Sequence, residues 1–288
     1  MASLRDIKRR IRSVTNTSKI TKAMQMVASA KMRRAQELAL RGREYIAAIA
    51  NVFEHLQETI AESASPLMQK REQGKVLVLV INTDRGLCGG LNSNLMREVL
   101  LQAPADADYI TIGGKLNAQI AKAGRNLAAT YSLGDDFTDS DLKPVLDHVR
   151  DSFTDGTYRE VLVAYQSFVN IMVQKPHVAP LLPITKEELL AVAGKDDMPD
   201  TDNGNFILEP NPSELLNAIL PIYFSNAITQ LVLEGKASEQ CARMVAMKAA
   251  TENAKTLIGD LTLEYNKARQ AQITNELLEI TTAMKAME

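Results

Sequence analysis

The stretch KVLVLVINTDRGLCGGLNSNLMREVLLQA, residues 75–103, has an apolar run, a glycine-rich loop and a helical pattern in succession. A strand, glycine loop and helix in this order begin many nucleotide sites. A phosphate loop, however, needs GxxxxGK[ST], and Gly86, Gly89 and Gly90 come with neither that Lys nor that Ser or Thr. The dinucleotide pattern GxGxxG also fails. We therefore expect the glycines to shape a tight turn, with nucleotide binding as the less favoured alternative.

The polar residues of this loop have two possible roles. Asp84 and Arg85 would most simply bind each other or a loop backbone group. Exposed polar loops at strand ends also often carry contacts to other molecules.

Outward from this loop, residues 75–208 alternate between strand-like and helix-like runs. Strand-like runs at 75–81, 108–113, 126–133 and 159–168 are separated by helix-like runs at 94–103, 115–124 and 140–153. This βαβαβ order predicts a mostly parallel sheet covered by helices. The proline-broken run 170–184 fits an edge or hairpin strand, and the acidic segment 186–204 fits a solvated loop.

Two long helices flank this central part. Residues 3–63 contain no proline between Ser3 and Ser63, and Asn211-Pro212-Ser213-Glu214 is a typical helix start for the run to Glu288. At 1.5 Å per residue these helices would be roughly 90 and 110 Å long, so each needs a partner along its length, and the simplest partner is the other helix. If both leave the same side of the central domain, they run antiparallel.

Apolar residues in both helices recur at alternating spacings of three and four, which is the pattern of a coiled-coil seam. In the first helix the phase slips in the middle, which predicts an interrupted register. The first helix has runs at Leu4, Ile7, Ile11 and Val14 and at Ala35, Leu38, Gly42, Tyr45, Ile49, Val52 and Leu56, joined through Thr17, Ile20, Met24 and Val27. The last helix has Ala254, Ile258, Leu261, Tyr265 and Ala268, then Ile273, Leu277, Ile280, Met284 and Met287.

The predicted fold class is therefore α/β plus a long antiparallel coiled coil. The domains are an N-terminal helix over 1–64, a Rossmann-like α/β domain over 75–208 inserted between the helices, and a C-terminal helix over 211–288.

The composition excludes several classes of function. The 288 residues carry a net charge of −2 and two cysteines, so neither a disulfide framework nor a bulk attraction to nucleic acid is indicated. The apolar runs are too short for a membrane-spanning helix. No His has a metal-ligand partner at the right spacing, and no nucleophile motif is present, so we predict no catalytic, cofactor or metal site.

Basic residues gather in the first helix, where a nucleic-acid contact is an alternative to a solvated face or a surface that meets an acidic protein. The near absence of aromatic residues there disfavours the nucleic-acid alternative. The basic residues are Lys8, Arg9, Arg10, Arg12, Lys19, Lys22, Lys31, Arg33 and Arg34.

Four motifs resemble those of the gamma subunit of F-type ATP synthases, in the same order and across essentially the whole chain. They are ITKAMQMVASAKMRRAQ (20–36), TDRGLCGGLN (83–92), ASEQCARMVAMKAATENA (237–254) and YNKARQAQITNELLEI (265–280). The resemblance implies a bacterial-type rotor shaft, one per complex. Ion flow turns a c-ring and the shaft with it, and the shaft drives ATP synthesis in a hexamer of three alpha and three beta subunits. It also implies that the chain itself binds no cofactor and performs no chemistry.

The resemblance further implies contacts, residue by residue, with a location on the cytoplasmic face of the plasma membrane through the complex. An epsilon subunit would dock beside the c-ring contact, and no partner for Cys241 in a redox pair is expected. Beta-subunit contacts are implied for Arg269, Gln270, Thr274, Glu276, Met24, Lys19, Lys22, Arg243, Asp84, Arg85 and Cys88, and c-ring contacts for Phe206 and Glu209.

Overall fold

The computed structural model describes residues 3–56, 65–185 and 211–287. The chain divides into two compact units. The helical unit comprises residues 1–28 and 243–288, and the central unit comprises residues 29–242. The two longest helices, α1 (Leu4–Leu56) and α6 (Pro212–Met287), each contribute to both units. Whether the predicted boundaries at 64, 75, 208 and 211 delimit independent domains stays a prediction.

The central unit is built on a five-stranded sheet in the order β3-β2-β1-β4-β5. Its strands are β1 (Lys75–Ile81), β2 (Asp108–Ile112), β3 (Asn126–Tyr131), β4 (Tyr158–Phe168) and β5 (Gln174–Leu182). The first four are mutually parallel, and β5 pairs antiparallel with β4 at the edge. The predicted mostly parallel α/β sheet with a proline-bearing edge strand is therefore confirmed.

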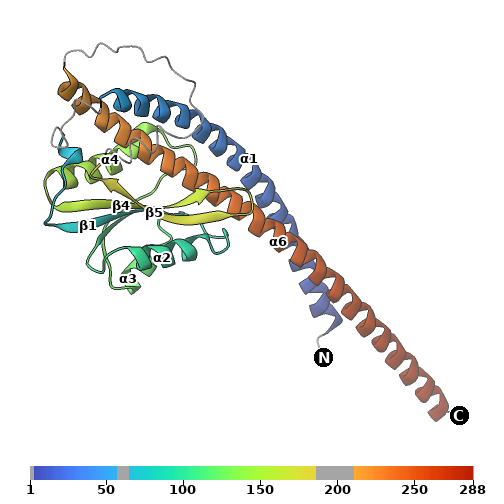
Figure 1. Ribbon diagram of the computed structural model, residues 1–288. Coiled ribbons are helices and arrows are strands. Elements are labelled where there is room, and N and C mark those ends of the chain that lie inside the picture. Colours follow the sequence, from blue (N-terminus) through green and yellow to red (C-terminus); the bar gives the residue numbers. More distant parts are fainter. Residues whose placement is uncertain (1–2, 57–64, 186–210, 288) are drawn as a thin grey trace. The chain divides into compact units, whose positions relative to one another are not determined.

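Helices cover both faces of this sheet (Figure 1). On one face α2 (Leu91–Gln102) and α3 (Asn117–Lys122) pack on the even-numbered residues of β1. On the other face α4 (Asp139–Thr154), the 3₁₀ turn η1 (Pro66–Met68) and the first part of α6 pack on Leu77, Leu79 and Ile81. Because both faces are buried, β1 is a continuous apolar run, as parallel strands usually are.

The start of α6 has the capping arrangement that the sequence predicts. The Glu214 backbone N–H donates to Asn211 Oδ1 at 2.9 Å, and Asn211 Nδ2 donates to Glu214 Oε1 at 2.7 Å. By length and apolar composition alone α6 would also qualify as a membrane span. Its apolar residues Leu216, Leu220 and Ile228 are, however, buried in the core of the central unit.

In the helical unit, residues 4–28 of α1 pair with residues 243–268 of α6 (Figure 1). From Met247 onward, a buried and half-buried stripe of α6 runs through Met247, Thr251, Ala254, Ile258, Leu261, Tyr265 and Ala268, which alternate at spacings of four and three; Ala250 is half-buried beside it. Thr21 and Thr251 meet in the middle of the interface, with their hydroxyl oxygens 2.7 Å apart. The predicted antiparallel coiled coil is confirmed over this stretch.

The predicted phase slip in α1 is wrong. The buried and half-buried stripe continues without interruption through Leu4, Ile7, Ile11, Val14, Ser18, Thr21, Gln25 and Ala28. Ile20 and Val27, which the slip would have buried, are instead 60% and 55% exposed. Small and polar residues occupy the middle of the seam and keep its register. In the second predicted run, Leu38 is exposed, and the side chains beyond it lie outside the described residues.

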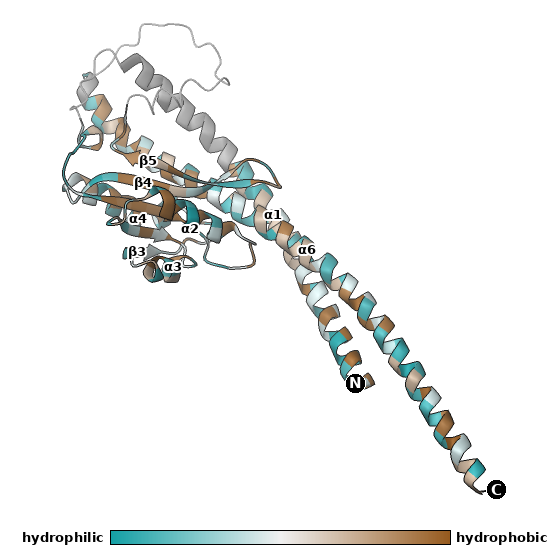
Figure 2. Ribbon diagram, turned by 60° about the horizontal axis from the view of Figure 1, so that its bottom comes forward, coloured by the Kyte–Doolittle hydropathy of each residue, from teal (hydrophilic) through white to brown (hydrophobic). Residues whose placement is uncertain are grey.

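The last part of α6 has no partner among the described residues. Every residue from Arg269 to Met287 is exposed, including Ile273, Leu277 and Ile280. Hydrophobic and hydrophilic residues alternate along this end of the helix in Figure 2. The prediction that the two helices pair along their whole length is therefore wrong for about the last 19 residues, or roughly 28 Å of helix.

Candidate functional site

The glycine loop leaves β1 at the carboxyl edge of the sheet, and its first residues are anchored in the domain. Asn82 is buried, donates from Nδ2 to the Gly113 carbonyl at 2.9 Å and accepts the Leu116 backbone N–H at 3.3 Å. The Thr83 hydroxyl donates to the Arg85 carbonyl and accepts Asn92 Nδ2 at 2.7 Å. These bonds connect the ends of neighbouring strands, so the loop has a fixed shape.

Asp84 binds a loop backbone group, which was one of its two predicted roles. Its Oδ1 accepts the Gly114 backbone N–H at 3.2 Å, and its Oδ2 accepts the Ser132 hydroxyl at 3.0 Å. These partners follow β2 and β3, so Asp84 ties three strand ends together. Arg85 next to it is exposed.

Two neighbouring residues of the loop differ in exposure: Cys88 is buried, whereas the apolar side chain of Leu87 is exposed. Cys88 is 3% exposed and its Sγ accepts Asn92 Nδ2. The contact implied for Cys88 stays a prediction. Leu87 is 61% exposed and has a φ of 65°, the left-handed region that a branched residue rarely adopts. The loop therefore holds an apolar side chain in solvent at a conformational cost.

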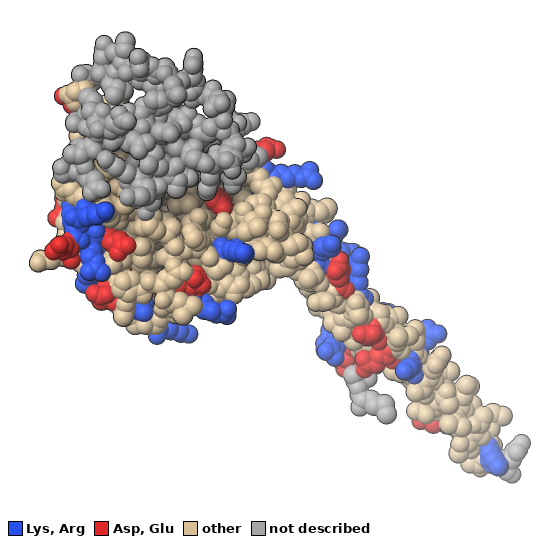
Figure 3. Space-filling view, in the orientation of Figure 1, with Lys and Arg blue, Asp and Glu red and all other residues tan. Residues whose placement is uncertain are grey.

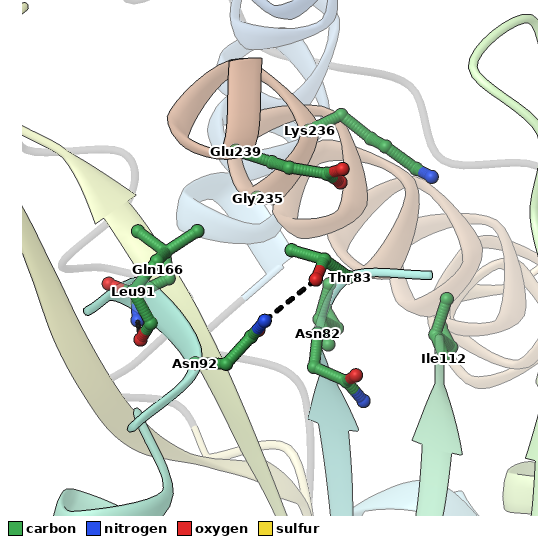
Figure 4. A pocket seen from close by; sticks show the side chains of 10 residues that line it. Asn82, Thr83, Leu91, Asn92, Ile112, Gln166, Gly235, Lys236 and Glu239 are labelled. Atoms are coloured by element: carbon green, nitrogen blue, oxygen red, sulfur yellow. Dashed lines mark hydrogen bonds between the residues drawn. The ribbon is translucent and has the colours of Figure 1, made fainter. Parts of the chain in front are cut away.

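A doubly wound sheet usually binds ligands where its strand order reverses, here between the carboxyl ends of β1 and β4. Figure 4 shows a pocket at this place, lined by Asn82, Asn92 and Gln166 on one side and by Gly235 and Glu239 of α6 on the other. Helix α6 lies so close that a Cβ on Gly235 would come within 3.0 Å of the Ile81 side chain. A helix of the same chain thus covers the position that a nucleotide would need, which disfavours the nucleotide-binding alternative.

The loop after β3 joins both long helices within the central unit. Lys31 of α1 forms an ion pair with Asp135 at 2.5 Å, and Lys236 of α6 donates to the Leu133 carbonyl at 2.7 Å. Burial alone would raise the pKa of Asp135, but the hydrogen bond from Lys31 and the charges of Lys31, Lys236 and Arg85 hold it below its usual range. Asp135 is therefore a carboxylate near neutral pH.

In the helical unit, Lys19 and Lys22 are brought together on the exposed side of α1, where Lys22 also donates to Gln25. Met24 is half-buried at the flank of the seam, so it does not share their face. On the visible side of this unit, Figure 3 shows basic and acidic side chains interspersed. A surface of mixed sign disfavours the nucleic-acid alternative, which needs a continuous basic stripe.

Four of the five predicted contacts on α6 lie beyond the end of the seam. Arg269 and Glu276 are seven residues apart and so share one face, and Gln270 and Thr274 share the adjacent one. All four are exposed. Arg243, by contrast, is 7% exposed, and Phe206 and Glu209 lie outside the described residues.

The structure also shows features that the sequence reasoning missed. They are the Thr21–Thr251 pair, the bonds around Asp135, and an exposed apolar turn at residues 169–173. Only the first carried a usable signal, since Thr21 continues the spacing of three and four from Leu4.

Comparison with known proteins agrees with the resemblance of the four motifs, and the matches extend over the whole length of the chain. A sequence model of the family described as ATP synthase matches residues 3–287. The chain is 59% identical over 291 residues to the ATP synthase gamma chain of Akkermansia muciniphila, with all of both chains covered. It is 42% identical over 292 residues to that of Methylacidiphilum infernorum, again with full coverage. The chain belongs to the ATP synthase gamma chain family.

The fold agrees with this family. A chain of the Euglena gracilis mitochondrial ATP synthase, in a structure of its OSCP, F1 and c-ring in rotational state 3, superposes with a TM-score of 0.70 at 21% identity. The match covers 99% of this chain and 94% of that one. As a gamma-family chain, the protein is a subunit of a rotary ATP synthase, in the F1 part of a membrane-associated complex.

Proposed function

We propose that this chain is the central rotor shaft of its ATP synthase and performs no catalysis itself. Rotation of a c-ring, driven by proton flow, turns the shaft inside a hexamer of three alpha and three beta subunits and drives ATP synthesis in sequence. The supporting observation is the full-length relationship to gamma chains at 59% identity. The covered switch point of the sheet agrees with a chain that has no nucleotide site of its own.

The unpaired end of α6 suits this role. An unpaired helix end with exposed apolar residues such as Leu277 and Ile280 gains stability when another surface covers it. A sleeve formed by the alpha and beta subunits would provide that surface. Contacts of modest strength allow the shaft to turn, because a deeply bound side chain would hold one angle.

The contact residues are part of the same proposal. Exposed charges attract an acidic beta-subunit surface weakly at every angle, because exposed ion pairs contribute only about 0 to 1 kcal/mol each. Arg243 and Met24 would contribute through the shape of the helices, and Cys88 through the shape of its loop. The proposed beta contacts are Lys19, Lys22, Met24, Asp84, Arg85, Cys88, Arg243, Arg269, Gln270, Thr274 and Glu276, and the proposed c-ring contacts are Phe206 and Glu209.

The partners and location follow from the proposed role. One copy of the chain would serve each complex, with an epsilon subunit beside the c-ring contact. The complex would lie at the cytoplasmic face of the plasma membrane, and the chain would reach the membrane only through the complex.

Reconstitution tests the proposal. Alpha and beta subunits from the same organism, mixed with this chain, should form a complex with cooperative ATPase activity, whereas a mixture without it should lack that activity. Failure of the chain to assemble with them would refute the rotor role. Saturable micromolar binding of ATP to the isolated chain would contradict the non-catalytic part and favour the nucleotide-binding alternative.

A further inference from the structure

The turn between β4 and β5, residues 169–173, presents a row of apolar side chains to solvent. Val169, Ile171, Met172 and Val173 are 53%, 46%, 76% and 40% exposed. Four large apolar residues in one five-residue turn are unusual, because a turn at a sheet edge is ordinarily polar.

The backbone of this turn is held firmly. Asn170 Oδ1 accepts the backbone N–H groups of Met172 and Val173, both at 2.9 Å. The backbone N–H groups of Asn170 and Val173 each donate to the other residue's carbonyl. The turn therefore has a defined shape that keeps its apolar side chains outward.

Helix α6 fixes the position of the same turn, which lies beside it in Figure 1. The buried thiol of Cys241 donates to the Ile171 carbonyl at 3.0 Å. About two turns earlier on the helix, Glu234 accepts the Ser167 hydroxyl and the Phe168 backbone N–H, both at 2.9 Å. Any force on the turn is thus passed directly to α6.

The turn lies at the same edge of the sheet as the glycine loop, because β1 and β4 are parallel neighbours. Gln166 near the end of β4 donates to the Leu91 carbonyl at the end of that loop, at 2.8 Å. The loop itself exposes Leu87. The two neighbouring connections therefore both present apolar side chains at the carboxyl edge.

We propose that Leu87 and the turn 169–173 form an apolar contact surface for the beta subunit, continuous with the proposed contact of the glycine loop. This inference rests on the proposed function. Apolar contact suits a moving partner, because it has no preferred direction and is proportional to the area covered. It would complement the weak ionic contacts without fixing one rotary angle.

Photocrosslinking in the assembled complex tests this surface. Met172→p-benzoylphenylalanine should give a covalent product with beta on irradiation. The matched control is Leu101→p-benzoylphenylalanine. Leu101 is 74% exposed, close to the 76% of Met172, but it lies near the end of α2, at the opposite edge of the sheet. It should give no beta product.

A third position separates this inference from the proposed function. Arg85→p-benzoylphenylalanine reports the glycine-loop contact itself. A beta product from position 85 but not from position 172 overturns the apolar surface and leaves the rotor role intact. A product of position 172 with alpha or epsilon instead of beta, or equal beta products from positions 172 and 101, overturns it as well. Absence of beta products from all three positions overturns both the apolar surface and the proposed glycine-loop contact.

Discussion

At the scale of single residues, the loop that first suggested a nucleotide site is organised by bonds within the domain. Asp84 uses both carboxylate oxygens to join strand ends, and Cys88 is buried beside Asn92. The sequence identified the loop, but it could not separate inward from outward side chains, because a turn has no periodicity. What reaches solvent is Arg85 and Leu87.

Gly113 and Gly114 provide a paired test of this packing. A Cβ on Gly113, whose φ is +96°, would lie 2.4 Å from the Asn82 carbonyl oxygen, whereas a Cβ on Gly114 would meet nothing within 4 Å. We expect Gly113→Ala to lower the free energy of unfolding by about 2 to 4 kcal/mol, because the chain must shift at a strained position. Gly114→Ala should change it by less than about 0.5 kcal/mol. Urea denaturation of the isolated chain measures both, and equal effects would contradict the close approach at Gly113.

Asp135 gives a pH-dependent prediction. Its pKa is lower in the folded state than in the unfolded chain, so its contribution to stability is present above the unfolded value, near 4, and is lost as pH falls through the folded value. Asp135→Asn should therefore cost about 0.5 to 1 kcal/mol at pH 7. The difference from the wild type should vanish under acid.

The control for Asp135 is Asp136→Asn. Asp136 pairs with Arg34 at 3.0 Å, but both side chains are about 70% exposed, so this change should have the smaller effect at pH 7. Denaturant unfolding at several pH values distinguishes them. A cost of Asp135→Asn that stays constant down to low pH would contradict the assigned ionisation.

At the scale of elements, the strands were predictable and the coiled-coil seam was only partly so. β1 follows its apolar run from Lys75 to Ile81, because a strand buried on both faces has a composition that little else shares. Between Val14 and Ala28 the predicted seam of α1 is wrong. The large apolar residues Ile20 and Val27 are exposed, and Ser18, Thr21 and Gln25 occupy the seam instead. The run from 170 was read as strand, although Asn170 makes its first residues a turn.

The Thr21–Thr251 pair allows a double-substitution test of the seam. Thr21→Val keeps the side-chain volume but removes one partner of a buried hydrogen bond, and should cost about 1 kcal/mol. Adding Thr251→Val removes the other polar group, so the double variant should cost less than the sum of the two single changes. Amide hydrogen exchange around residues 18–24 and 248–254 reports this local stability. Strict additivity would show that the two hydroxyls do not interact.

At the scale of the whole molecule, the end of α6 makes no packing contact with the other described residues. The described side chains from Arg269 to Met287 are all exposed, whereas those at Leu261 and Ala254 are buried. The resemblance to the gamma family implies contact residues on this portion. Periodicity alone gave it a seam, because an apolar stripe is the same whether its partner belongs to the chain or to another subunit.

Truncation after Ala268 separates these two situations. Removal of residues 269–288 should leave the melting temperature of the isolated chain unchanged, because no buried contact is lost. In the reconstituted complex the same truncation should lower ATPase activity, because four of the proposed beta contacts are absent. Calorimetry and a steady-state ATPase assay measure the two effects. A large fall in the melting temperature of the isolated chain would show that this portion does pack within it.

The antiparallel seam has a consequence for biosynthesis. Residues 4–28 leave the ribosome first, but their seam partners at 247–268 are translated about 240 residues later. At bacterial and eukaryotic elongation rates of about 5 to 20 residues per second, the nascent first helix waits for roughly 10 to 50 s. During that interval its Leu4, Ile7 and Ile11 stripe is uncovered. Because the centre of the stripe is polar, at Ser18, Thr21 and Gln25, the ribosome-bound chain exposes a shorter apolar surface to chaperones and to neighbouring nascent chains.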